Sequence, residues 1–373
     1  MNCLIEGAAH PSPDLDLTLN MHVLAHKISN FRISHSRSIR TDKGRSGISQ
    51  FKNSFIFTIS ALQSDLSMTR TPLSRPLHGI IPPMVTPLLD PQTLDDAGLS
   101  RLIERMIEGG VHGLFVLGTT GEGPGLSYRL RRELIARTCQ IVCGRVPVLV
   151  AITDTSVEES LSLGDWAAGC GADAVITAAP YYFEVSQNDL YRLVECLSTR
   201  LALPLYLYNM PSLTKAFFAP ETVVRASHLD NVYGIKDSSG DLEYVRAITT
   251  AFRDRQDFSI LVGPEELLVQ SMALGAHGGV NGGANLFPRL FVRLYEAAVA
   301  GDLVTVETLQ QRVAELGHLL YRIGEAESSY LRGLKLGLGL MGICSSAMVQ
   351  PFQAAEPSNH ETLRRFLNPL DHI

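Results

Sequence analysis

The chain has 373 residues, of which 45% are hydrophobic and 19% charged, and its formal net charge at pH 7 is −6. This composition is typical of a soluble globular protein, and the length accommodates one large domain or two ordinary ones. The mild charge gives no reason to expect nucleic acid as a partner. No run approaches the ~18 apolar residues of a membrane helix, so a membrane is not expected as a partner either.

The cysteines are too scattered to suggest a metal site. Cys139 and Cys143 lie one helical turn apart, but no second pair completes a zinc site. The scattered positions of the cysteines favour reduced thiols in the core of a cytoplasmic protein. The six positions are Cys3, Cys139, Cys143, Cys170, Cys196 and Cys344.

Residues 1–75 differ from everything after them, being rich in Ser, Arg, Lys and His with little periodic apolar pattern. Three interpretations compete: a disordered extension, a targeting peptide, or an untranslated segment whose true start codon lies at or near Met68. Glu6, Asp14 and Asp16 argue against a targeting peptide, which is usually poor in acidic residues. We favour the extension or the later start and leave this segment out of the fold prediction.

From His78 onward, apolar runs alternate with helical periods. The first expected strand, 79–85, is interrupted by Pro82 and Pro83, and the first helix starts at Asp95 or Asp96 and ends at 108. Further strands are expected at 113–117, 148–152, 174–178, 205–208, 232–236, 258–262 and 278–281. Further helices are expected at 127–142, 156–168, 187–197, 220–226, 242–252, 265–274 and 288–300.

These elements form eight strand–helix units, spaced by roughly 25 residues. The strands are continuous apolar runs, as expected when both faces of a sheet are covered. The pattern predicts an α/β fold, a (β/α)₈ TIM barrel over residues 76–300. A doubly wound open sheet is the alternative, but the chain lacks its glycine fingerprint for dinucleotides. Residues 301–373 are predicted to be helical, at 304–320, 328–340 and 362–367, and to cover a barrel face or form an oligomer interface.

Lys236 ends a predicted buried strand, which is an unusual place for a lysine because an unpaired ammonium is costly to bury. Burial lowers the pKa of a lysine, and a neutral amine attacks carbonyl carbons. The alternative is a surface ion pair with Asp237. In a barrel, active sites lie at the carboxyl ends of the strands, where this sequence also supplies Thr86, Thr119 and Tyr208. An amine, a phenol and hydroxyls suit Schiff-base chemistry, and backbone N–H groups of a glycine–threonine turn can hold a carboxylate.

Three motifs together resemble those of the dihydrodipicolinate synthase/N-acetylneuraminate lyase family: Gly118-Thr-Thr-Gly-Glu122, Tyr208-Asn-Met-Pro211 and Gly234-Ile-Lys236. The resemblance covers roughly residues 77–370. It implies a homotetrameric barrel with a C-terminal helical part, and class I aldolase chemistry through a Schiff base with pyruvate, without metal or cofactor. The resemblance further implies that Lys236 forms the imine, while Tyr208 and Thr119 relay protons. It implies that Thr120 and Gly121 hold the carboxylate of the keto acid. Tyr182 would reach into a neighbouring subunit's site, and Val280 would offer a backbone carbonyl near the imine.

Departures from the family pattern bear on the substrate. Leu213 stands where the synthases carry an arginine that binds the second substrate's carboxylate, and Lys215 stands where glycine is usual. In lacking this arginine, the chain resembles the neuraminate lyases and the 2-keto-3-deoxy sugar acid aldolases. Glu265 and Glu266 stand where neuraminate lyases place an acidic pair that binds sugar hydroxyls, although an aspartate is more usual at the first position. The stretch Arg332-Gly-Leu-Lys335 is also lyase-like.

Against a strict neuraminate lyase, Thr119 replaces a serine, Ser238 replaces a threonine, and Gly282 stands where a hydroxyl residue is expected. The sequence therefore predicts a lyase that reversibly cleaves a keto-deoxy sugar acid to pyruvate and an aldehyde. Three alternatives remain open. They are a 4-hydroxy-tetrahydrodipicolinate synthase that condenses pyruvate with aspartate semialdehyde, a dehydratase of keto-deoxy sugar acids, and a non-catalytic keto-acid-binding barrel.

Overall fold

The computed structural model describes residues 73–320, 323, 329–356, 359–361, 363–364 and 367. The predicted N-terminal extension lies outside the described residues as far as residue 72. Within the described part of the chain, no helix combines the length and the hydrophobicity needed to cross a bilayer. The same residues contain no group of three or more His, Cys, Asp or Glu side chains arranged to hold a metal ion.

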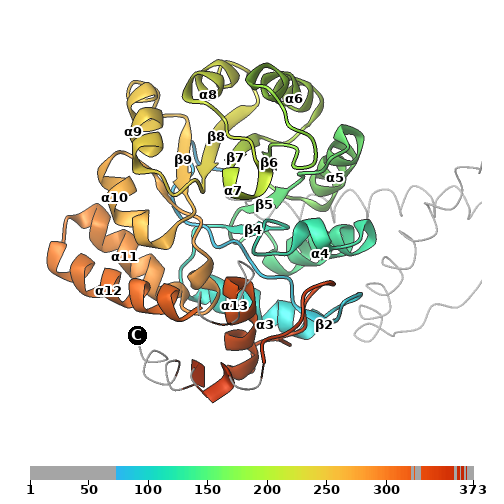
Figure 1. The fold of residues 1–373 in the computed structure, drawn as a ribbon, viewed down its shortest axis with the longest axis vertical. Coiled ribbons are helices and arrows are strands. Elements are labelled where there is room, and N and C mark those ends of the chain that lie inside the picture. Colours follow the sequence, from blue (N-terminus) through green and yellow to red (C-terminus); the bar gives the residue numbers. More distant parts are fainter. Residues whose placement is uncertain are drawn as a thin grey trace, which may run out of the picture. The chain divides into compact units, whose positions relative to one another are not determined.

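Eight parallel strands form the centre of the molecule, which confirms the predicted (β/α)₈ barrel (Figure 1). Their order in the sheet is β1-β10-β9-β8-β7-β6-β5-β4. The ring closes beyond β1, where the Met84 N–H donates to the Phe115 carbonyl at 2.8 Å and the Phe115 N–H donates to the Pro82 carbonyl at 3.0 Å. The strands are β1 (Gly79–Ile80), β4 (Leu114–Val116), β5 (Val148–Ala151), β6 (Ala174–Ala178), β7 (Leu205–Asn209), β8 (Val232–Asp237), β9 (Ser259–Val262) and β10 (Gly278–Gly279).

The first strand is much shorter than predicted. Residues 79–85 were expected to form it, but regular pairing ends at Ile80 and only an isolated bridge from Pro83 to Phe115 continues it. Pro82 and Pro83 lack the N–H that a ladder requires, so each contributes only its carbonyl. The chain still follows the barrel wall to Thr86.

A ring of helices covers the strands in the predicted order (Figure 1). Local signals set their starts. The Ser127 side chain accepts from the Leu130 N–H at the start of α4 (Tyr128–Val142), and Asp95 accepts from the Gly98 N–H at 2.8 Å at the start of α3 (Asp96–Glu108). The predicted helix 265–274 is divided into a 3₁₀ turn, η3 (Glu265–Leu267), and α10 (Leu268–Ala273). The others are α3 (Asp96–Glu108), α4 (Tyr128–Val142), α5 (Val157–Cys170), α6 (Gln187–Arg200), α8 (Pro220–Ala226), α9 (Leu242–Ala251) and α11 (Pro288–Ala300).

Five short elements were not predicted. The antiparallel pair β2 (Leu88–Asp90) and β3 (Thr93–Leu94) follows β1, and the 3₁₀ turn η2 (Gly123–Gly125) follows β4. The one-turn helix α7 (Pro211–Thr214) follows β7, and the 3₁₀ turn η4 (Gly282–Asn285) follows β10. The last three lie just beyond the carboxyl ends of strands, so they build the mouth of the barrel.

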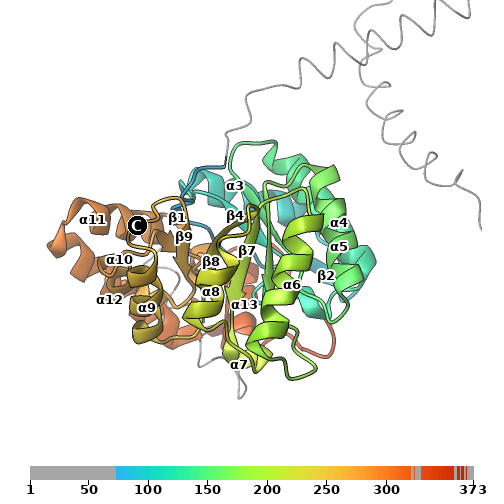
Figure 2. The same ribbon diagram turned by 90° about the horizontal axis from the view of Figure 1, so that it is seen from above.

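Two C-terminal helices extend the barrel: α12 (Leu303–Leu320), which packs on α11, and α13 (Ser329–Leu340), which packs on α12 and η4. Figure 2 shows α7 beyond the end of β7, with α13 toward the same end of the barrel. A buried ion pair joins Lys335 of α13 to Glu122 in the loop after β4. Of the predicted helix 362–367, only 363–364 and 367 belong to the described residues.

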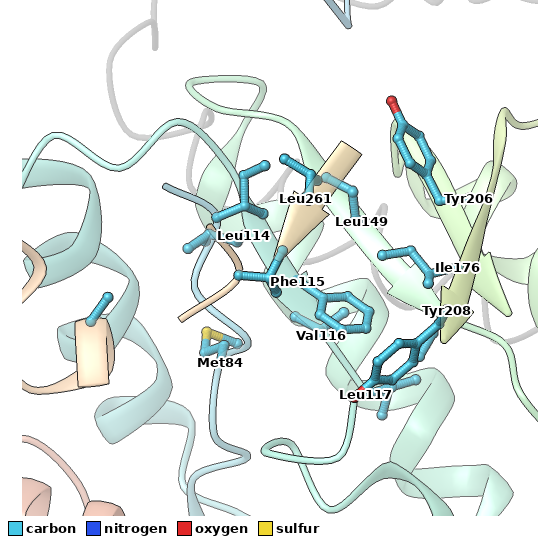
Figure 3. Close-up of a cluster of buried hydrophobic side chains, with 14 of the residues drawn as sticks. Met84, Leu114, Phe115, Val116, Leu117, Leu149, Ile176, Tyr206, Tyr208 and Leu261 are labelled. Carbon is cyan, nitrogen blue, oxygen red and sulfur yellow. The ribbon is translucent and has the colours of Figure 1, made fainter. Parts of the chain in front are cut away.

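Apolar side chains fill the barrel interior, and every residue of β4, β5, β6, β7 and β9 is buried. Figure 3 shows part of this core, with Phe115 of β4 and Tyr208 of β7 beside Leu117. The rings of Phe115 and Tyr208 meet edge to face, with centroids 6.3 Å apart. Above this apolar plug the strand ends carry the polar side chains of the candidate site.

Candidate active site

Lys236 is buried inside the barrel near the carboxyl end of β8, with 4% of its surface exposed. It stands level with Tyr208 of β7 on one side and Leu261 of β9 on the other. Its Nζ lies 4.0 Å from the centroid of the Tyr208 ring and 4.9 Å from that of Phe115. The amine is therefore enclosed by aromatic surface, which shields it from bulk water.

Asp237 is not the ion-pair partner of Lys236, so the surface-pair alternative is wrong. Successive strand residues point to opposite faces. The Asp237 carboxylate accepts from the Asn209 amide at 2.8 Å and from the Ser239 hydroxyl at 2.8 Å. Burial raises the pKa of Asp237, and these hydrogen bonds only partly oppose that effect. Asp237 thus fixes the turn after β8 and leaves Lys236 directed inward.

Tyr208 and Thr119 form a hydroxyl pair beside the amine. The Tyr208 Oη and Thr119 Oγ1 lie 3.3 Å apart. Burial by itself would raise the pKa of the Tyr208 phenol, but the charge of Lys236 and hydrogen bonds with Thr119, Lys236 and Ser238 outweigh it and hold the pKa below its ordinary value. A phenol with a lowered pKa, next to an amine and a second hydroxyl, can accept and return protons.

The turn after β4 presents backbone donors to the same mouth. It is closed by the Glu122 N–H, which donates to the Thr119 carbonyl at 3.0 Å, and its far side is fixed by Thr86, whose hydroxyl donates to the Gly121 carbonyl at 2.6 Å. Among the described residues, nothing accepts a hydrogen bond from the N–H groups of Thr119, Thr120 or Gly121. Thr120 and Gly121 are buried. Buried backbone donors without a partner are costly, and together they suit a carboxylate.

Ser238 and Val280 follow the carboxyl ends of β8 and β10, two strands that are separated in the sheet by β9. The Ser238 N–H donates to the Asn209 carbonyl at 2.8 Å, and the Ser238 hydroxyl contributes a hydrogen bond to Tyr208. The Val280 N–H donates to the Val262 carbonyl at 2.7 Å, whereas its own carbonyl accepts from no residue that the structure describes. Val280 is 2% exposed, so this carbonyl is a buried acceptor close to the end of β10.

The predicted acidic pair is split. Glu265 is buried beneath the mouth, where it accepts from the Gly283 N–H at 2.6 Å and from the phenol of Tyr330. Burial raises the pKa of Glu265 to about 7, against the opposing effect of these hydrogen bonds. The next residue, Glu266, is exposed on the surface. The two side chains diverge because η3 begins here and turns the chain by about a third of a helical turn per residue.

Leu213 lies on α7 at the rim, and Lys215 directly follows this helix. Leu213 is 44% exposed, and Lys215 is exposed and has a left-handed backbone with φ 58°. A glycine adopts that conformation without strain, which gives a physical reason for the glycine usual in the family. Here the lysine adopts it, so an exposed ammonium stands two residues after Leu213, the position where the synthases carry arginine.

Tyr182 is on the loop after β6 and is 75% exposed. Its ring meets that of Phe183, itself 76% exposed, with centroids 5.1 Å apart. Because both aromatic side chains are exposed in the single chain, a second copy of the chain could contact them. The predicted contribution of Tyr182 to a neighbouring site requires such a contact.

Sequence reasoning missed Tyr330 and the Glu122–Lys335 ion pair as parts of this region. Lys335 also donates to the Ala347 carbonyl at 2.7 Å, and the Glu122 carboxylate accepts from the Val349 N–H at 2.9 Å. Glu122 was visible as the last residue of a motif, and Lys335 as part of a lyase-like stretch. Nothing in the sequence indicated that the two meet, because they are separated by more than half of the chain.

Comparisons with known proteins agree with this geometry. The model of the dihydrodipicolinate synthetase family matches residues 76–370. A 4-hydroxy-tetrahydrodipicolinate synthase of Methanopyrus kandleri is 33% identical over 296 residues, covering 79% of this chain and 96% of the relative. A probable 2-dehydro-3-deoxy-D-pentonate aldolase, YjhH of Escherichia coli K12, is 36% identical over 240 residues, covering 64% of this chain and 80% of the relative.

Solved structures show the same fold. The dihydrodipicolinate synthase of Bacteroides thetaiotaomicron is 52% identical, with a TM-score of 0.78 and coverage of 80% of this chain and 100% of that chain. YagE of Escherichia coli K12, solved in complex with pyruvate, is 28% identical, with a TM-score of 0.75 and coverage of 79% and 98%. The chain therefore belongs to the dihydrodipicolinate synthetase family and is an enzyme of the class I aldolase type, which works through a Schiff base.

Proposed function

We propose that this enzyme reversibly cleaves a hydroxylated 2-oxo acid, of the keto-deoxy sugar acid class, to pyruvate and an aldehyde. The observation that carries the proposal is the enclosed cluster of Lys236, Tyr208 and Thr119 beneath a rim on which Leu213 replaces a cation. The cluster accounts for the chemistry and the rim for the choice of aldehyde.

The reaction starts with attack of the Lys236 amine on the C2 keto carbon, followed by loss of water to give the imine. Tyr208 removes the proton of the C4 hydroxyl, the C3–C4 bond breaks, and its electron pair moves into the imine to form an enamine. The aldehyde leaves from the mouth. Protonation of the enamine at C3 and hydrolysis of the imine release pyruvate and return the amine. Thr119 carries protons between the Tyr208 phenol and the reacting atoms.

The substrate carboxylate binds at the turn after β4 in this scheme. The N–H groups of Thr119, Thr120 and Gly121 have no acceptor among the described residues, so a carboxylate that enters gains hydrogen bonds without displacing protein contacts. Binding there holds the keto carbon over the amine, and orientation of this kind lowers the barrier for imine formation. The buried Val280 carbonyl is a further acceptor for the protonated imine.

Leu213 supports an aldehyde without a carboxylate. A site for aspartate semialdehyde must bind a second carboxylate, for which a bidentate arginine is well suited and a leucine offers no hydrogen bond. A neutral hydroxylated aldehyde needs no cation at the rim.

A 4-hydroxy-tetrahydrodipicolinate synthase is the second candidate, because several relatives carry that name, including the Methanopyrus kandleri protein. Lys215 favours it as well, since its exposed ammonium is only two residues from Leu213 and is able to pair with a carboxylate at the rim.

The deciding experiment compares wild type, Leu213→Arg and Lys215→Gly, each assayed with pyruvate plus aspartate semialdehyde and with a panel of keto-deoxy sugar acids. We expect wild type to prefer the sugar acids, and Leu213→Arg to gain ~10-fold or more toward aspartate semialdehyde at their expense. Efficient condensation by wild type that Lys215→Gly abolishes would establish the second candidate instead.

A further inference from the structure

The turn that presents N–H groups to the keto acid has a strained backbone. Leu117 precedes it and Glu122 ends it, and both adopt a left-handed conformation, with φ values of 62° and 55°. Residues with a Cβ atom rarely adopt this conformation, because it costs free energy. Gly123 follows with no room for a side chain, since a Cβ atom there would collide with the Leu117 carbonyl. Contacts from outside the turn must therefore hold it in shape.

The C-terminal part of the chain supplies such contacts through the Glu122 side chain. The carboxylate forms an ion pair with Lys335 of α13 and accepts from the Val349 N–H at 2.9 Å. Lys335 also donates to the Ala347 carbonyl at 2.7 Å. Both side chains of the ion pair are at most 1% exposed, so water does not replace either partner. Because an unpaired buried charge is costly, each side chain fixes the other.

The ion pair reaches the site through the backbone of the turn. The Glu122 N–H donates to the Thr119 carbonyl at 3.0 Å, and Glu122 directly follows Gly121. A displacement of Glu122 therefore moves the N–H groups of the turn. The charge of Glu122 matters as well, because a carboxylate next to this turn repels a second carboxylate unless a cation neutralises it. Lys335 is that cation.

We propose that Glu122 and Lys335 are positioning residues for the keto acid. Their ion pair holds the turn of residues 119–121 in the conformation that binds the substrate carboxylate, and it cancels the negative charge of Glu122 beside that site. The proposal rests on the placement of the carboxylate in the proposed function and adds the residues that fix it. It assigns α13 a role in substrate binding, exerted through the turn after β4.

The test compares two ketones that differ in the carboxylate. Enzyme is incubated with cyanoborohydride and either pyruvate or acetone, each well below saturation, and formation of the reduced adduct on Lys236 is followed by mass spectrometry. Acetone is a methyl ketone like pyruvate but has no carboxylate, so the ratio of the two trapping rates measures what the carboxylate contributes. A loss of folded protein lowers both rates equally and leaves the ratio unchanged. We expect wild type to trap pyruvate much faster than acetone.

The primary variant combines Lys335→Met with Glu122→Gln, which removes both charges and keeps an acceptor for the Val349 N–H. Without the ion pair the turn is no longer held, and we expect the ratio to fall by about 10-fold. Lys335→Met alone should lower the ratio further, because the remaining Glu122 carboxylate also repels the substrate.

Leu197→Ala is the matched control for a loss of stability. Leu197 is buried in the last turn of α6, which leads to the amino end of β7, so its truncation destabilises the protein at a distance from the mouth. We expect its ratio to equal that of wild type. The proposal is overturned if the double variant keeps the wild-type ratio, if Lys335→Met discriminates better than the double variant, or if Leu197→Ala lowers the ratio as much.

The outcome for the proposed function is read separately, from wild type. If wild type traps pyruvate much faster than acetone and cleaves keto-deoxy sugar acids, an unchanged ratio in the double variant rejects the positioning role alone. If wild type shows no preference for pyruvate, the carboxylate site of the proposed function fails, and the positioning role fails with it.

Discussion

At the scale of single residues, the site depends on charges that are held close together away from water. The ammonium of Lys236 and the hydroxyl of Thr119 together lower the pKa of Tyr208 against the effect of burial.

The position of Lys236 at a strand end was predictable, because a lysine that ends a buried apolar run is conspicuous. The hydrogen bond from Tyr330 to Glu265 was not predictable, since it depends on how α13 packs against η4. The divergence of Glu265 and Glu266 was missed because a 3₁₀ turn begins at Glu265.

Thr119→Val tests the electrostatic coupling at this scale. The substitution keeps the shape of the side chain and removes the hydroxyl that lowers the pKa of Tyr208, so that pKa should rise. Because cleavage uses the deprotonated phenol as a base, the acidic limb of the kcat/KM profile should move to higher pH and kcat should fall by about 10²-fold. A pH–rate series on the two proteins measures both effects. A limb that stays in place would exclude Thr119 from the proton relay.

At the scale of elements, short turns after the strands shape the mouth, and they were the hardest to predict. Helices that begin with a proline, such as 220–226 and 288–300, have the predicted bounds because this start signal is local. The four-residue helix α7 was missed because it is too short for any periodicity. The Glu122–Lys335 ion pair joins α13 to the turn that carries Thr119 and Thr120. Both side chains are at most 1% exposed.

Removing one partner of that ion pair should lower the free energy of unfolding more than removing both charges does. Lys335→Met leaves the Glu122 carboxylate buried without a cation, and we expect the free energy of unfolding to fall by about 3 kcal/mol. Adding Glu122→Gln keeps an acceptor for the Val349 N–H and removes the buried charge, so the double variant should recover about half of that loss. Urea unfolding of wild type, Lys335→Met and the double variant measures both changes in the free energy of unfolding.

An exposed pair provides the control for this experiment. Arg145 and Glu104 are 39% and 45% exposed, so Arg145→Met should change the free energy of unfolding by less than ~1 kcal/mol. A double variant less stable than Lys335→Met would show that the Glu122–Lys335 attraction is not what connects α13 to the barrel.

At the scale of the whole molecule, Tyr182 and Phe183 are exposed in the single chain, as the predicted contribution of Tyr182 to a neighbouring site requires. The homotetramer remains a prediction from family resemblance. If Tyr182 acts in a neighbouring site, each site combines Tyr208 of one chain with Tyr182 of another. The barrel, its strand order and the site lysine follow from one chain, whereas this arrangement depends on contacts between copies.

Mixing two inactive variants tests the shared site. Tyr182→Phe and Tyr208→Phe should each lose most activity, but a hybrid pair contains one site with both phenols intact. With random exchange of subunits between two-fold related pairs, activity should return to about a quarter of the wild-type value. Steady-state assays after denaturation and joint refolding measure this. Continued inactivity of the hybrids, with oligomers shown to be mixed, would assign Tyr182 to its own chain.

The most direct test of the central claim is reductive trapping of pyruvate. Wild-type enzyme is incubated with pyruvate and borohydride, and the adduct is mapped by peptide mass spectrometry. We expect one stable adduct on Lys236. We also expect Lys236→Arg to abolish both adduct and turnover, because a guanidinium stays protonated at any working pH. Lys215, exposed at the rim, is the internal control and should stay unmodified. An adduct on Lys215, or none on Lys236 in an enzyme that turns over its substrate, would show that Lys236 does not form the imine.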